Sequence, residues 1–115
     1  MTATTVDIGT GPDGTLVIRP TGSLDDADAV DLQRALVHAI RHTRPLRLVV
    51  DLVAVGDLDP INLGTLAAAC LLGDEHKVAV FLDHPRQLIA DRLASAGVPA
   101  HRVRHVSDGI PLPGR

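Results

Sequence analysis

Two histidines stand four residues apart in a stretch with helical periodicity, and this spacing lets two imidazoles reach one metal ion. They are His38 and His42, and zinc enzymes use the same spacing on a helix. The sequence marks no third ligand, and both residues fall on the polar side of the amphipathic pattern. His101 and His105 share the spacing, but their segment favours a strand, where they would lie about 13 Å apart. We therefore predict a solvated helix face and no metal site.

Three aspartates would form a general acid–base pair if the fold brought them together. Asp25 follows one apolar stretch, and Asp57 and Asp59 follow another. Neighbouring parallel strands end on the same edge of a sheet, which would place these carboxylates near one another. Acid–base catalysis also needs one carboxyl with a raised pKa. Helix capping explains Asp25 and Asp59 more simply, so we predict that the protein is not an enzyme.

The hydroxyl and thiol groups of the chain lack the surroundings of an activated nucleophile. Covalent catalysis needs such a group beside a base that a third residue orients, and the chain contains no Gly-x-Ser-x-Gly elbow. Cys70 lies within the apolar run Leu66–Leu72, which is typical of a core position. The glycine-rich stretch 9–14 leads into a strand-like segment, whereas a phosphate-binding loop opens a helix. We predict neither nucleophilic catalysis nor a bound cofactor.

The composition limits the partners that the chain can attract. Its 115 residues match the size of one domain, and we predict a single domain with its core at about 6–106 and a flexible tail at 107–115. Phe81 is the only Phe, Tyr or Trp, so the chain lacks aromatic platforms on which single-stranded nucleic acid stacks. A net charge of −3 gives no general attraction to phosphate backbones or anionic lipids. We predict no binding to nucleic acid.

The sequence also predicts a cytoplasmic protein that does not insert into membranes. A lone cysteine cannot form an internal disulfide, which fits a reducing compartment. Residues Met1–Thr5 lack the basic and apolar stretches of a signal peptide. The longest apolar run, Leu66–Leu72, is much shorter than the roughly 20 residues that span a bilayer.

The elements that must position these residues follow from the spacing of apolar side chains. A reversal at 9–14 joins two short β-prone stretches into an antiparallel hairpin. An amphipathic helix, capped by the acidic residues that follow Leu24, runs to just before Pro45. The apolar runs Leu46–Leu52 and Lys77–Leu82 suit strands that are covered on both faces or lie within a sheet.

Two further helices and a last strand complete the pattern. Asp59-Pro60 is a helix start, and the helix that follows to Leu72 is apolar almost all round, so we expect it to be largely buried. A third helix begins at 83–85 and ends at Gly97. Its apolar stripe is formed by Leu88, Ile89, Leu93 and Ala96. Residues 101–106 alternate as in an edge strand. The order ββαβαβαβ predicts an α/β fold with a mixed, mainly parallel sheet of about four or five strands and helices packed on it.

Several motifs resemble those of the STAS family, the anti-sigma factor antagonists. Gly22-Ser23-Leu24-Asp25, before an alanine-rich amphipathic helix, is similar to the family's Gly-x-Leu-Asp segment. The strand Leu48–Leu52 and the later segment Leu58–Gly64 are similar to the family's strand and its Leu-Asp-Ser-Ser-Gly-Leu-Gly loop. The close of the third helix at Leu93–Val98 also matches. The resemblance covers nearly the whole chain in order, and it implies the STAS fold and a non-enzymatic regulatory role.

One position of the loop departs from the family's pattern. In STAS antagonists a partner kinase, often the anti-sigma factor itself, phosphorylates the second serine of the loop, and the unphosphorylated form binds the partner and frees the sigma factor. Asp59 is identical to the family's aspartate. Pro60 stands in place of the first serine, and Asn62 stands in place of the glycine. Ile61 stands at the phosphoacceptor. Because Ile61 has no hydroxyl, the phosphate that would add about −1.5 to −2 charge cannot form there.

The resemblance implies a surface that binds an anti-sigma factor or a related serine-kinase-like regulator. Without the switch, we expect an antagonist that phosphorylation at this position cannot turn off, or a scaffold subunit. Thr65, one turn beyond Ile61, is the candidate substitute acceptor. The residues expected at the partner surface are Ser23, Leu24, Asp25, Asp26, Asp57, Asp59, Pro60, Ile61, Asn62, Leu63 and Gly64.

Other classes of function stay open at this point. The chain would also serve as an accessory subunit of a transport system, or as a module that binds a small ligand or nucleotide, since relatives of this fold do so. A small enzyme using Asp25 and Asp59 is a less favoured reading, and a homodimer is compatible with the resemblance. Neighbouring genes distinguish the first two: transporter genes favour an accessory subunit, and anti-sigma kinase genes favour an antagonist.

Overall fold

After an initial hairpin, strands and helices alternate along the chain. The computed structural model describes residues 5–11, 13–24 and 26–106, and it describes side chains for 8–11, 13–22 and 29–106. The elements in chain order are β1 (Thr5–Thr10), β2 (Thr15–Leu24), α1 (Asp26–His38), the π-helical turn η1 (Ala39–Thr43), β3 (Arg47–Asp51), β4 (Val55–Leu58), α2 (Pro60–Glu75), β5 (Ala79–Asp83), α3 (Gln87–Ser95), the 3-10 turn η2 (Ala100–Arg102) and β6 (Val103–Arg104). The tail 107–115 and Asp25 lie outside the described residues.

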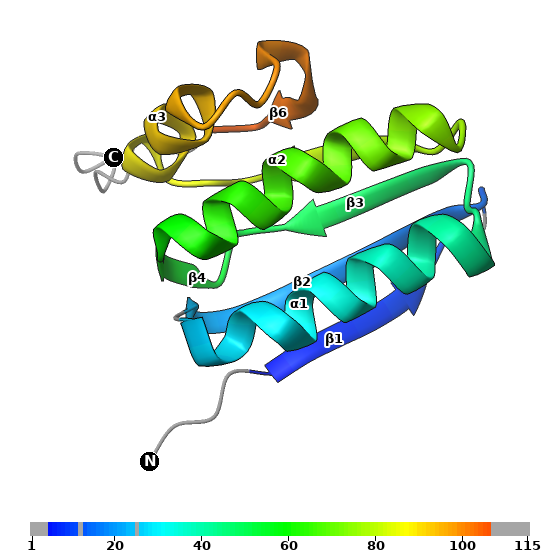
Figure 1. Ribbon diagram of the computed structural model, residues 1–115, viewed down its shortest axis with the longest axis horizontal. Coiled ribbons are helices and arrows are strands. Elements are labelled where there is room, and N and C mark those ends of the chain that lie inside the picture. The colour runs from blue at the N-terminus through cyan, green and yellow to red at the C-terminus, as the bar shows by residue number, and fades with distance from the viewer. Residues whose placement is uncertain (1–4, 12, 25, 107–115) are drawn as a thin grey trace, which may run out of the picture.

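The strands form a mixed, mainly parallel sheet, as the element order predicts, but with six strands in place of the expected four or five (Figure 1). Its order is β1-β2-β3-β5-β6, and β4 pairs with β2 beside this path. β1 and β2 are antiparallel, whereas the other pairs are parallel. β4 is a strand where the sequence predicts a loop. Its four residues bury only the first and the last side chain, which is too short a pattern to indicate a strand.

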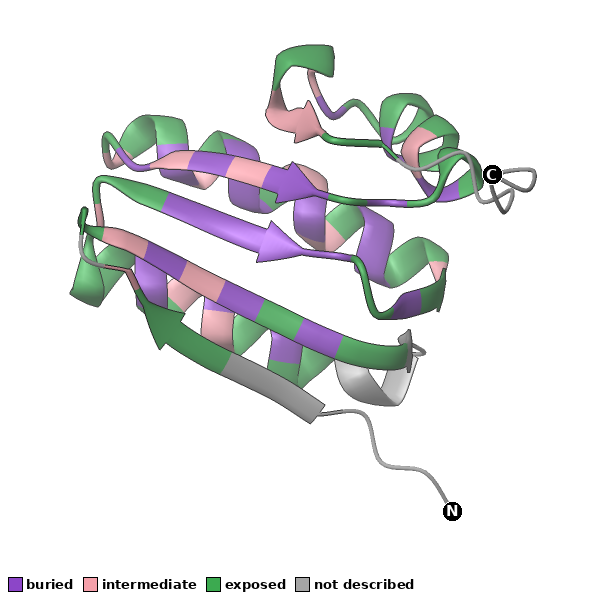
Figure 2. Ribbon diagram, turned by 180° about the vertical axis from the view of Figure 1, so that it is seen from behind, coloured by how far each residue is buried: buried purple, intermediate pink, exposed green. Residues whose placement is uncertain are grey.

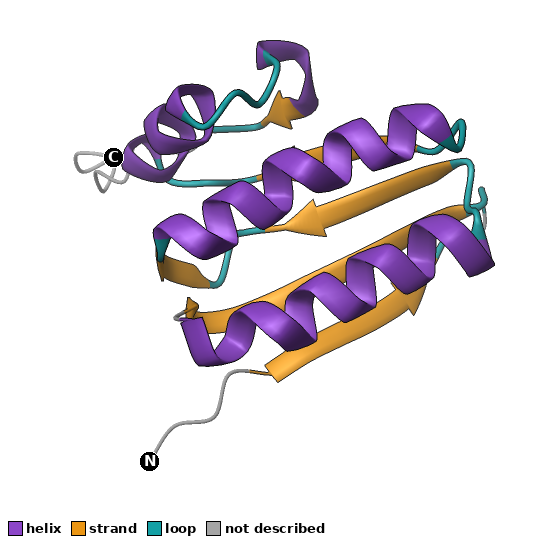
Figure 3. Cartoon of the chain, viewed as in Figure 1, coloured by secondary structure: helices purple, strands orange, loops and turns teal. Residues whose placement is uncertain are grey.

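α1 and α2 lie side by side over one face of the sheet, and no helix of the described chain covers the other face (Figures 2 and 3). Alternate strand residues point toward the helices and are fully buried. They include Ile18, Leu48, Val50, Val80 and Leu82. Of the two alternatives for the runs 46–52 and 77–82, the structure therefore supports strands that lie within the sheet, since β3 stands between β2 and β5, and β5 between β3 and β6. On the open face the side chains of neighbouring strands shield one another, which leaves Val49 only 7% exposed.

The two long helices bury one side each. α1 and η1 turn the predicted stripe toward the sheet, and Leu32, Leu36 and Ile40 are almost completely buried. α2 is not buried all round as predicted, because Ile61 and Leu71 are 56% and 65% exposed. A helix in the outer layer faces the sheet on one side only, so its remaining apolar residues meet solvent. Among the described residues, no helix has the length and apolar character needed to cross a membrane.

The C-terminal elements are shorter than predicted. α3 begins at Gln87, later than expected, because β5 extends to Asp83. Two of the four positions expected in its apolar stripe, Leu88 and Ala96, are exposed. The helix therefore contacts the core along a narrower line than its sequence indicates. The strand expected at 101–106 is reduced to the two residues of β6, which follow a 3-10 turn.

A glycine allows the end of α2 to lie against β5. A Cβ atom at Gly73 would stand 2.5 Å from Cγ2 of Val80 and 2.6 Å from the carbonyl oxygen of Val78. The backbone N–H of Val78 donates to the Gly73 carbonyl over 2.8 Å. Any larger residue would push the helix away from the sheet.

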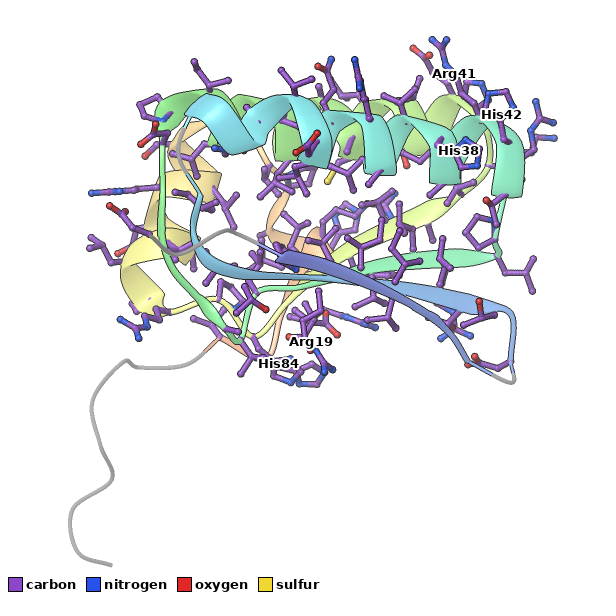
Figure 4. All side chains as sticks on the ribbon, turned by 90° about the horizontal axis from the view of Figure 1, so that it is seen from below. Arg19, His38, Arg41, His42 and His84 are labelled. Carbon is purple, nitrogen blue, oxygen red and sulfur yellow. The ribbon has the colours of Figure 1, made fainter. Side chains whose placement is uncertain are left out.

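On the open face, one carboxylate joins three parts of the sheet. Asp51, at the end of β3, accepts hydrogen bonds from Arg19 Nε and from the Val53 N–H, both over 3.1 Å. Nδ1 of His84, which follows β5, lies 3.2 Å from the same carboxylate. Figure 4 shows Arg19 and His84 on the side of the sheet away from the helices. Burial acts to raise the pKa of the Asp51 carboxyl, but these hydrogen bonds outweigh it and hold the pKa below its ordinary value.

A second ion pair lies beside Asp51 on the open face, nearer the edge of the sheet. Arg104 donates two hydrogen bonds to Asp83, over 2.7 Å and 2.8 Å. The Arg104 guanidinium also lies 4.1 Å from the centroid of the Phe81 ring, which is a cation–π distance. The chain's only phenylalanine is thus covered by an arginine on the face that lacks helices.

We expect Asp51→Asn to lower the free energy of unfolding by about 1–3 kcal/mol at pH 7, because it weakens charge-assisted hydrogen bonds. The pKa of Asp51 is lower in the folded state, so its contribution is fully present above the unfolded pKa of about 3.9 and is lost as the pH falls through the folded pKa. Urea unfolding of both proteins between pH 7 and about pH 3 measures this. A difference that does not shrink at acid pH would contradict the assignment.

The single cysteine is shielded in the core, as predicted. Cys70 is 1% exposed, and burial raises the pKa of its thiol to about 11. The thiol is therefore protonated near neutral pH, and only the thiolate reacts rapidly.

We expect a thiol reagent at pH 8 to label the native protein at less than about a hundredth of the rate seen in denaturant. Labelling at equal rates would show that the helix opens readily.

Candidate functional site

The last part of β2 lies beside β4, which brings two predicted segments of the site together. The N–H of Gly22 donates to the Ala54 carbonyl over 3.0 Å, and Asp26 begins α1 directly beyond. The register pairs Gly22 with Val55, Ser23 with Asp57, and Leu24 with Leu58. The backbones of the two segments therefore adjoin, whereas the sequence argument made this depend on the ends of the second and third strands being neighbours. The neighbour of β2 at this edge is β4 rather than β3.

The start of α2 follows directly from β4. Asp59 occupies the N-cap position with extended backbone angles, and Pro60 is the first helical residue, as the sequence predicts. The Leu63 N–H donates to the Asp59 carbonyl over 3.0 Å and closes the first turn. The expected cap itself is absent, because the Asp59 carboxylate makes no capping hydrogen bond to the described helix. Proline supplies the fixed backbone angle and removes one donor that would need capping.

The first turn of α2 presents some residues of the motif and buries others. Pro60 and Gly64 are exposed, and Ile61 is 56% exposed. Asn62 is fully buried and Leu63 is 8% exposed, so these two side chains lie inside the domain and not on its surface. A Cβ atom at Gly64 would meet nothing within 4 Å beyond its own helix. The first turn of α2 therefore exposes the apolar side chains of Pro60 and Ile61, and no side chain projects beside them at Gly64.

An ion pair ties this edge to the third helix. Arg92 Nη1 of α3 lies 3.0 Å from Oδ1 of Asp57, and both side chains are exposed. The Leu58 N–H donates to the same oxygen over 2.9 Å. Such a surface pair contributes only about 0–1 kcal/mol to stability, but it fixes the direction of both side chains. Arg92 is absent from the predicted site, because it stands 35 residues from Asp57 and only the fold brings them together.

Thr65 stands one turn after Ile61 and is half-buried. Its hydroxyl donates to the Ile61 carbonyl over 3.0 Å, within the helix. A kinase would have to turn this hydroxyl away from the backbone before phosphate transfer.

Four of the histidines form two pairs of neighbouring rings. The His38 and His42 rings have their centroids 5.0 Å apart, and the His84 and His105 rings stack at 5.3 Å. Across the part of the chain that the structure describes, His, Cys, Asp and Glu form no group of three or more able to hold a metal ion. Among the described side chains, the partner of Asp57 is Arg92, and the side chain of Asp25 lies outside them.

These observations define a small α/β module with helices on one side of its sheet and an exposed isoleucine where α2 begins. A family model for the STAS domain matches residues 10–106, and the chain belongs to that family. The search of curated proteins finds no significant match.

Solved structures of similar fold include anti-sigma factor antagonists. The crystal structure of an anti-sigma factor antagonist from Mycobacterium paratuberculosis is 29% identical, with 81% of this chain and 79% of that chain covered and a TM-score of 0.65. The phosphorylated form of SpoIIAA, a Bacillus cell fate determinant, is 13% identical over 90% of this chain and 93% of that one, with a TM-score of 0.74. RsbS from Moorella thermoacetica is 20% identical over 89% and 85%, with a TM-score of 0.72. The last two likenesses concern the fold alone.

We expect Gly64→Ala to raise the free energy of unfolding by about 0.5–1 kcal/mol, because alanine favours a helix and its methyl group meets no neighbour. Gly73→Ala in the same helix is the matched control, and it should destabilise the protein, because its methyl group would overlap Val78 and Val80. Urea unfolding measures both. A loss of stability in Gly64→Ala would show that this glycine serves the fold and not an open surface.

Proposed function

We propose that this STAS-domain protein is a regulator that binds an anti-sigma factor, or a related serine-kinase-like protein, through the start of α2. The docking surface comprises Pro60, Ile61 and Gly64, with the Asp57–Arg92 pair at its side. The backbone of Ser23, Leu24 and Asp26 flanks it, and Asp25 belongs to the same segment of sequence. The protein acts by binding and not by catalysis, and it meets its partner in the cytoplasm of a bacterium.

The observation that carries this proposal is the exposure of Ile61. The chain leaves 56% of this side chain in solvent, at the position where STAS antagonists carry their phosphoacceptor. A partner that covered it would gain the free energy of burying an aliphatic side chain, about 1.5–3 kcal/mol in full. Gly64 beside it leaves room for the partner's backbone to come close. Likeness to the Mycobacterium paratuberculosis antagonist supports the same role.

The chemistry of Ile61 also determines how binding is regulated. A phosphate at this helix start would add about −1.5 to −2 charge to the docking surface and repel an acidic or apolar partner. An isoleucine cannot accept phosphate, so the surface stays uncharged at this position. The protein is therefore always able to bind, and control passes to its synthesis or to its partner.

We expect Ile61→Glu to abolish partner binding, because a carboxylate imitates the charge that phosphorylation gives to relatives. Leu46→Glu is the matched control. Leu46 is 72% exposed and precedes β3, at the opposite end of the parallel strands from the start of α2 (Figure 1). Wild-type protein and both variants are immobilised, and proteins captured from extracts of the native cells are quantified. The expected result is one kinase-like ATPase enriched by wild type and by Leu46→Glu, and reduced at least about tenfold with Ile61→Glu.

Two results would contradict the proposal. One is the failure of wild-type protein to enrich any ATPase or sigma-factor regulator. The other is equal capture by Ile61→Glu, which would put the interface elsewhere on the domain. Intact mass measurement of the protein from its own cells completes the test, because phosphate on Thr65 or Ser23 would mean that the chain retains a switch at another residue.

A further inference from the structure

A groove runs between α1 and α2 on the helical side of the molecule. Its cavity volume is about 330 Å³, and its floor consists of the buried side chains of Leu36, Ile40 and Ala69. The lining residues of each helix recur at intervals of three and four, so the groove follows the helix axes. Figure 1 shows that these two helices lie side by side along most of their length.

The rim of this groove exposes apolar side chains alongside the polar Gln33 and Glu75. Leu71 is 65% exposed, next to the half-buried Leu72, and Val37 lines the facing side. An apolar cavity of about 150 Å³ already admits a benzene-sized group, so this groove has room for two or more bulky side chains. Covering Leu71 would remove from water one of the largest apolar surfaces that the domain exposes.

A row of basic side chains follows α1 beside the groove. Arg34, His38 and His42 are each four residues apart, and they line a second hollow of about 420 Å³ that shares Gln33 and Val37 with the groove. All three side chains of the row are exposed. Within the described residues, none of the three forms an ion pair with an acidic side chain.

More positive charge lies at the C-terminal end of the row. Figure 4 shows Arg41 gathered with His38 and His42 at that end of the helical layer, on the opposite side of the sheet from Arg19. The groove itself ends at Glu75 on the α2 side. One flank of the groove therefore carries two arginines, Arg34 and Arg41, among the two histidines, although the chain as a whole has a net charge of −3 with histidine counted as neutral.

The length of the basic row determines what kind of ligand fits. A helix rises about 1.5 Å per residue, so Arg34 and His42 are separated by about 12 Å along the axis. The single head group of a small anionic amphiphile cannot reach the whole row. An amphipathic helix can, because its apolar positions and its acidic flank repeat with the same pitch as α1 and α2.

We propose that the groove between α1 and α2 binds an amphipathic helix of a partner protein, with acidic residues on the flank that faces Arg34 and His38. Leucine-sized side chains of that helix enter the groove beside Leu71. This surface lies along the helices, beyond the start of α2, and it is independent of the docking surface around Ile61. The domain then has two binding surfaces, one at the start and one along the side of the same helix.

The test uses a synthetic helical peptide of about 18 residues, or five turns, with leucines along one face and glutamates on one flank. A second peptide carries lysines in place of the glutamates. Binding to the whole protein is followed by amide NMR shifts and calorimetry. We expect the acidic peptide to shift amides in α1 and α2, and to bind at least about tenfold more tightly than the basic one. Its affinity should fall as salt screens the charges.

Matched variants identify the surface. Leu71→Glu should lower the affinity for the acidic peptide at least about tenfold. Leu88→Glu, at a helical leucine with 64% exposure, should leave this affinity unchanged. Arg34→Glu should lower the affinity several-fold. The control is Arg86→Glu, at an exposed arginine before α3, which should leave the affinity unchanged. Ile61→Glu should bind the peptide like wild type, which separates this surface from the docking surface.

Four outcomes would overturn the proposal. The first is the absence of binding by either peptide, and the second is equal binding of both with no difference between Leu71→Glu and Leu88→Glu. In the third, dodecanoate shifts the groove amides and the acidic peptide does not, which would assign the groove to a small aliphatic ligand. In the fourth, sedimentation shows a dimer that Leu71→Glu separates into monomers, which would make a second copy of this chain the occupant.

Discussion

The parallel ladder of β2 changes its partner part-way along the strand, and the position of the start of α2 depends on this change. β2 has ten residues and β3 has five, so β3 pairs only with the first part of β2. β4 takes up the segment Gly22–Leu24, whose backbone groups would otherwise lack partners within the sheet. Because β4 is followed at once by Asp59 and Pro60, its pairing also fixes where α2 starts and which way it leaves the sheet.

α2 combines two kinds of packing along one helix. Near its end, Gly73 removes a side chain so that the helix can touch β5. Near its start, Gly64 faces open space and Ile61 faces solvent. A helix of 16 residues needs only part of its length to hold the core, and the remainder is free to carry recognition. The fold thus separates stability, which rests on the buried side of the helix, from the proposed binding surfaces at its start and on its outer side.

Much of this architecture could be predicted, because apolar periodicity reports on burial over long segments. The strands around Ile18, Val50 and Leu82 and the helices that cover them follow from it. β4 could not be predicted, since four residues give no clear period. The exposure of Leu88 was missed because a sequence pattern shows which face is apolar and not how much of that face finds a neighbour. The contacts of Asp51 and Asp57 join residues more than thirty positions apart, and only the register of the sheet and the position of α3 bring them together.

Phe81 is the chain's sole Phe, Tyr or Trp, and its ring lies under Arg104. The chain therefore absorbs very little light in the near ultraviolet. Its core of aliphatic side chains emits no fluorescence of its own. Any tryptophan on a bound protein would therefore report its surroundings without background from the domain. The same property makes the protein hard to detect by absorbance during purification, so its concentration is best followed through the peptide bond.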